Sequence, residues 1–125
     1  MTRKAGSVEA VKPPVQFEQL TSRYPEMAEA YERFGRSATE AGPLEARLVH
    51  LLKLGMAIGM RHEGAVHAHT RKALAAGFQP DELRHAALLA APTMGWPAMM
   101  AAFLWVEDEL KAAGESRTVT TEGMS

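Results

Sequence analysis

Apolar residues recur with the period of an α-helix through most of this chain, and proline or glycine interrupts the pattern between segments. The pattern predicts helices over roughly residues 17–38, 44–60, 61–76, 80–90 and 97–113. Pro25 and Pro80 suit the first turn of a helix, and Gly77 suits a left-handed stop after one. No stretch alternates apolar and polar residues as a half-buried strand would. The sequence therefore predicts an all-α fold.

The 125 residues are enough for one compact domain, expected at 15–113 between flexible polar tails at 1–14 and 114–125. A net charge of −1, without a basic stripe, argues against a nucleic-acid partner. No long uncharged apolar run or signal-peptide pattern is found, so we expect a cytoplasmic protein without a membrane partner. The absence of cysteine excludes disulfides and thiol chemistry.

Two segments carry more apolar surface than one helix face can hold. Residues 44–60 are apolar nearly all round, which predicts a helix buried on several sides, with Gly55 and Gly59 in close contact with a neighbouring backbone. Residues 98–106, AMMAAFLWV, contain no charge. They predict a homo-oligomer that buries these side chains between subunits, the alternative being that they fill the core of one monomer.

Three of the five histidines lie within the stretch GMRHEGAVHAHTRKALAAG, residues 59–77. On a helix, His62 and His69 fall in line with small apolar residues, so each is either a hydrogen-bonded core histidine or part of a site. Glu63 and His67 are spaced i, i+4, which is typical of an exposed surface pair.

The spacing of these histidines favours proton transfer over metal binding. His62 is five residues before His67 and seven before His69, whereas two ligands from one helix are usually four apart. A metal would need help from another group, for example His50 or Glu63. A histidine and a partly desolvated glutamate, in contrast, can exchange protons with a substrate at neutral pH. Trp96 could either wall such a pocket or anchor the surface between two helices.

Residues 47–103 resemble the carboxymuconolactone decarboxylase family, which includes alkylhydroperoxidase D-like proteins. The features that carry the resemblance are Gly59-Met60, Glu63-Gly64, His69-Thr70-Arg71, the stop at 73–77, the Pro-Asp-Glu-Leu start at 80–83, and Gly95-Trp96-Pro97-Ala98. The resemblance implies an all-helical fold with a central antiparallel helix pair, assembled as a homo-oligomer such as a trimer or hexamer.

The alkylhydroperoxidase D-like branch carries C-x-x-C-x-x-x-H and an upstream glutamate that forms a proton relay. In this chain the relay histidine falls on His69 and the glutamate on His50, while His62 and Ala65 stand at the cysteine positions. Both sulfurs are therefore missing, and the thiol peroxidase activity of that branch does not carry over.

The decarboxylase branch matches better, through Gly59-Met60, Glu63-Gly64 and His69, although His62 stands where that branch tends to have arginine. The resemblance implies a carboxy-lyase that acts on a small carboxylate or lactone by general acid/base chemistry and needs no metal or cofactor. Its catalytic residues would be Glu63, His69 and His62. Arg61, His50 and Trp96 would bind the small-molecule substrate.

Two other hypotheses remain open from the sequence. A relative without cysteine could bind a metal or a small ligand through His50, His62 and His69, because two relay positions now hold histidine. The chain could also be a structural scaffold whose side chains fill the space between the second and third helices.

Overall fold

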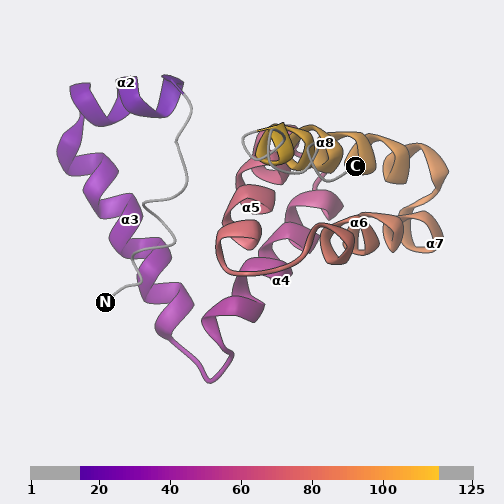
Figure 1. Cartoon of the computed structure of the whole chain (residues 1–125). Coiled ribbons are helices and arrows are strands. Elements are labelled where there is room, and N and C mark those ends of the chain that lie inside the picture. The colour runs from indigo at the N-terminus through magenta and orange to yellow at the C-terminus, as the bar shows by residue number, and fades with distance from the viewer. Residues whose placement is uncertain (1–14, 116–125) are drawn as a thin grey trace.

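The computed structural model describes residues 15–115, and helices make up most of this part of the chain (Figure 1). In order they are α2 (Val15–Arg23), α3 (Pro25–Glu40), α4 (Ala46–Gly59), α5 (Glu63–Ala75), α6 (Pro80–Leu88), α7 (Ala90–Met94) and α8 (Trp96–Glu115). No strand forms within residues 15–115, so the prediction of an all-α fold is confirmed. The tails predicted at 1–14 and 114–125 lie outside the described residues except for 114 and 115, which belong to the end of α8 and not to a tail.

Several helix limits follow from the residues that the sequence places there. Pro25 and Pro80 each open a helix, where a missing backbone N–H costs nothing. The Gln79 N–H donates to Oε1 of Glu82 at 2.8 Å, which satisfies one of the free donors at the start of α6. Gly77 has a φ of +102°, so the predicted left-handed stop after α5 is confirmed.

Three features differ from the predicted helix limits. The first predicted helical region, 17–38, is two helices, because the chain bends at Tyr24 and restarts at Pro25, where a helix start was expected. The third helix begins at Glu63 instead of residue 61, since the His62 side chain caps it and Arg61 has a φ of +55°. Residues 90–94 form the separate short helix α7, which the sequence pattern did not distinguish from its neighbours.

The α4–α5 hairpin is the centre of the bundle. The two helices are joined by only three residues and contact each other more extensively than any other pair, as the expected central antiparallel pair would. Helix α8 lies across α5, α6 and α7. The shared core includes Leu54 of α4, Val66 of α5, Leu83 of α6 and Val106 of α8, all completely buried.

The uncharged segment 98–106 packs mainly into this core. Ala98, Met99, Ala102 and Val106 are buried, and within the segment only Leu104 is largely exposed, at 54%. The alternative reading, that these residues fill the core of one monomer, therefore describes the segment better than the prediction of a subunit interface. The reason is that α8 is covered by three helices of its own chain.

Helix α4, in contrast, is buried on one side only. Leu54, Ala57 and Ile58 face the core, while Leu48, Leu52, Met56 and Met60 are exposed and form what we call the α4 stripe. A Cβ added at Gly55 or Gly59 would meet no atom within 4 Å. The prediction that a neighbouring backbone contacts these glycines was therefore wrong for the single chain.

Helices α2 and α3 form an arm that stands apart from the α4–α8 bundle (Figure 1). Helix α3 contacts α4 only sparsely. Met27, Tyr31 and Phe34, spaced i, i+4 and i+7, are 65%, 68% and 74% exposed, and we call them the α3 stripe. The periodicity thus predicted a helix correctly, but its apolar face has no cover within residues 15–115.

Candidate functional site

The cations expected to hold a substrate lie at the turn between α4 and α5. Arg61 and His62 are both exposed, and Arg61 adopts the left-handed conformation. The His62 Nδ1 accepts a hydrogen bond from the backbone N–H of Ala65 at 3.0 Å, so this ring serves as the N-cap of α5. The structure therefore gives His62 a capping role and leaves Arg61 in solvent.

Glu63 contacts His67 and not His69. Oε2 of Glu63 lies 3.3 Å from Nε2 of His67, as expected for an i, i+4 pair. Nδ1 of His67 also lies 2.6 Å from Oε2 of Glu109, whose other partner is the Arg71 guanidinium at 3.0 Å. His67 is consequently half-buried, in contrast to the exposed residue we expected, and this network links α5 to α8.

His50 lies on α4 and His69 on α5, the two helices of the hairpin, and His50 acts electrostatically on His69. Both are half-buried, and the Nδ1 atom of each is buried without a hydrogen-bond partner among the described residues. The pKa of His69 is lowered to about 4, by burial first and then by the positive charges of Lys72 and Lys53 and by His50. Burial and the same two lysines also lower the pKa of His50. Both rings are therefore neutral at pH 7.

Lys53 and Lys72 are members of this cluster that our sequence reasoning missed. Each follows a histidine by three residues, since His50-x-x-Lys53 lies on α4 and His69-x-x-Lys72 on α5. Residues three apart share a helix face, so the repeated H-x-x-K spacing could have identified both lysines. Burial lowers the pKa of Lys72, and Lys53 and Arg71 lower it further, whereas Glu32 of α3 opposes them.

Trp96 was expected to close the pocket. It is the first residue of α8, follows the sharp turn at Gly95 (φ +105°), and is 66% exposed. Helix α7 packs against this end of α8. Within the single chain, Trp96 is therefore a surface residue between two helices, which was the alternative to a residue that walls a pocket.

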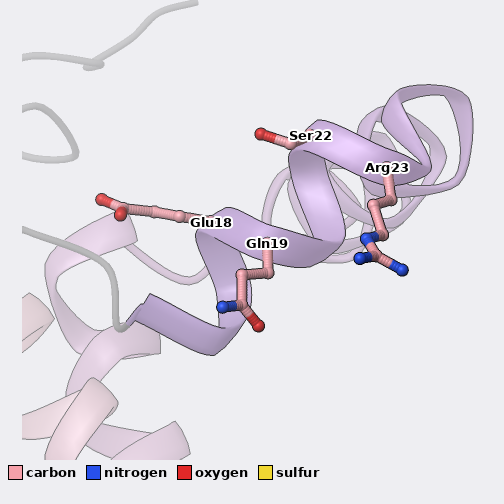
Figure 2. A pocket seen from close by; sticks show the side chains of 4 residues that line it. All are labelled: Glu18, Gln19, Ser22 and Arg23. Carbon is pink, nitrogen blue, oxygen red and sulfur yellow. The ribbon is translucent and has the colours of Figure 1, made fainter.

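Two surface hollows lie away from the histidine cluster. One is formed by Glu18, Gln19, Ser22 and Arg23 of α2 alone, and Figure 2 shows these four side chains spread along a single exposed helix. The other, of about 320 Å³, lies between the opposite side of α4, at Leu51 and Ile58, and helices α6 and α7. Neither contains a histidine of the α4–α5 pair.

A metal centre finds no support in the geometry. Within residues 15–115, no three histidine, aspartate or glutamate side chains gather closely enough to hold an ion. His62, one of three ligands in that hypothesis, is used as a helix cap. The cluster that remains consists of His50, His69, Lys53 and Lys72, which is suited to proton transfer near a negative charge.

None of the helices described is long and apolar enough to cross a membrane.

Comparisons with known proteins agree with this architecture. The carboxymuconolactone decarboxylase family model matches residues 25–108. An uncharacterised protein of Haemophilus influenzae is 36% identical to this chain over 57 residues. The matched segment makes up 46% of this chain and 50% of that relative's length. The crystal structure of a candidate carboxymuconolactone decarboxylase from Burkholderia xenovorans LB400 is similar, with a TM-score of 0.56 and 28% identity, and the match covers 82% of this chain and 84% of that one.

Proposed function

The chain belongs to the carboxymuconolactone decarboxylase family, and from this premise we propose that it is a carboxy-lyase that removes CO₂ from a small carboxylate by proton transfer through His69. The proposal does not include the thiol chemistry found in part of the family, because the chain has no cysteine. The substrate class is a β-keto acid or a carboxylated lactone, in which a carbonyl can accept the electron pair left by CO₂.

The observation that carries the proposal is the paired, neutral imidazoles of His50 and His69. A neutral imidazole holds an N–H donor on one nitrogen and a lone pair on the other. It can therefore hand over one proton and take up another without a net change of charge. The unpartnered Nδ1 atoms leave hydrogen-bonding capacity in both rings that the folded chain does not use.

In the proposed step, the bond between the carboxylate carbon and its neighbour breaks and CO₂ leaves. The electron pair stays on the neighbouring carbon and is delocalised into the adjoining carbonyl. The N–H of His69 gives its proton to that carbon while its other ring nitrogen takes a proton from water, directly or through His50, and the hydroxide left behind is balanced by its addition to the released CO₂ as bicarbonate. The neighbouring ammonium groups lower the energy of the negative charge that develops in the transition state.

This proposal changes the roles expected for three residues. Glu63 and His69 are six residues apart on α5, about 9 Å along the helix axis at ~1.5 Å per residue. We therefore assign Glu63 to positioning His67, and His62 to capping α5. His50, expected only to bind substrate, becomes the proton-relay partner of His69.

A search for substrates tests the function directly. Purified protein is incubated with a panel of β-keto acids and carboxylated lactones, and released CO₂ is measured. We expect turnover of at least one compound, a loss of about 100-fold or more in His69→Asn, and a loss below about tenfold in Glu63→Gln. His85→Asn, the same change at an exposed histidine of α6, is the control. Absence of turnover across the panel, or full activity in His69→Asn, contradicts the proposal.

We also propose that the active form is a homo-oligomer in which a second copy covers the α4 stripe. Its exposed leucine and methionine side chains surround Gly55 and Gly59, where the lack of neighbouring atoms allows close approach of another helix. The α3 stripe adds a second apolar face on the same chain. Contiguous apolar faces of this kind are rare on proteins that remain monomeric.

The double substitution Leu52→Glu/Met56→Glu is expected to convert the oligomer to monomers, because it places two charges on the α4 stripe. Sedimentation equilibrium measures the mass of both forms, and Leu104→Glu, an exposed leucine outside either stripe, is the matched control. A wild-type protein that sediments as a monomer at micromolar concentration, or a double variant of unchanged mass, would show that the stripe is not the interface.

A further inference from the structure

The lysines beside the histidine pair are the part of the cluster that proton transfer alone does not explain. Lys53 and Lys72 come from different helices, and both act electrostatically on His50 and on His69. Each lysine also follows its histidine by three residues on the same helix face, and α4 and α5 pack directly against each other. Across residues 15–115 neither lysine forms an ion pair with a carboxylate, although Arg33, Arg47, Arg71 and Arg84 all do.

The nearby charges do not balance the two ammonium groups. Glu32 of α3 favours the charged form of Lys72 but forms no ion pair with it. Arg71 adds a positive charge, and its own partner is Glu109 at 3.0 Å. Half-buried like charges that form no ion pair are costly, and an anion that binds between them lowers this cost.

We propose that Lys53 and Lys72 bind a carboxylate group of a small-molecule ligand, with His50 and His69 contacting the same ligand through their unpartnered ring nitrogens. The inference rests on the proposed function in that the ligand would be the substrate of the decarboxylation. It assigns substrate binding to His69 and Lys72, about two and three helical turns along α5 from His62, and not to Arg61 and His62, the cations that the sequence suggested.

The arrangement favours a small carboxylate over a polymer. The two lysines lie in a half-buried position on one helix pair and not along a surface stripe, and the whole chain carries a net charge of −1. A nucleic-acid backbone needs an extended positive surface. Two ammonium groups with two neutral N–H donors instead suit a compact anion, and a dicarboxylate can meet both ammonium groups at once.

Malonate, a compact dicarboxylate, is the probe in the test. The full chain is titrated with malonate at pH 7 and constant ionic strength while the histidine ring resonances are followed by NMR. We expect saturable shifts of the His50 and His69 signals and weaker binding of acetate. Lys53→Met and Lys72→Met should each weaken malonate binding at least about tenfold, because each removes a charge-assisted hydrogen bond. Lys111→Met, at an exposed lysine of α8, should leave the binding unchanged.

Folding of Lys72→Met is checked by circular dichroism, and Lys72→Gln gives a second neutral variant that keeps a polar side chain. An absent or non-saturable shift in the wild type, or binding that survives both lysine substitutions, overturns the carboxylate site. Inorganic phosphate that binds more tightly than malonate would overturn the assignment of a carboxylate. Malonate binding without turnover of any substrate would leave this inference intact and contradict only the decarboxylase function.

Discussion

Turnover is expected to persist well into the acid range, with kcat/KM close to its neutral value at pH 5 and falling only as the pH approaches 4. The pKa of His69 is about 4, lowered by burial first and by Lys72, Lys53 and His50 next. The neutral ring is the active form, so activity is lost as the pH falls through that pKa. A histidine with the ordinary pKa of about 6.5 would be only ~3% neutral at pH 5, which makes the difference about thirtyfold.

The prediction is checked by a pH profile of kcat/KM together with an NMR titration of the His69 ring in the free protein. Lys72→Met supplies an internal comparison, because removing the ammonium charge should raise the pKa of His69 and move the acid limb to higher pH. An acid limb near pH 6.5 in the wild type would show that His69 is exposed to water or is not the proton donor.

The fold could be predicted from the sequence to the extent that local signals determine it. Pro80 and Gly77 gave helix limits directly, because their backbone preferences act within one turn. The exposure of α4 could not be predicted in this way. Its side chains are apolar nearly all round, and periodicity cannot distinguish a face covered by the same chain from one that is left free.

The residues of the site could likewise be predicted only where the signal lies within one segment of the sequence. His69 and His50 were among the predicted residues, and both lie on the α4–α5 hairpin, where His50 acts electrostatically on His69. The contact of His67 with Glu109 spans 42 residues of sequence, so no motif on α5 could have revealed it. The H-x-x-K spacing was present on both helices, but its meaning depends on the packing of α4 against α5, which the spacing alone does not reveal.

The substitution Leu54→Ala is expected to lower the free energy of unfolding by about 2–5 kcal/mol, because it leaves a cavity where a completely buried side chain packed. For a domain of this size, that corresponds to a decrease in Tm of roughly 10 °C or more. Leu104→Ala, at a leucine that is 54% exposed on α8, should change the unfolding free energy by less than about 1 kcal/mol. Both are measured by urea denaturation.

The position of Leu54 connects this stability effect to the site. It lies one helical turn after His50, on the side of α4 that packs in the shared core, so a cavity there loosens the contact between α4 and α5. Since the His50–His69 pair depends on that contact, catalysis should decrease at temperatures where Leu54→Ala is still folded. Equal losses of stability in Leu54→Ala and Leu104→Ala would contradict the core position of Leu54. Full activity in a destabilised Leu54→Ala would show instead that the two histidines do not depend on the packing of the hairpin.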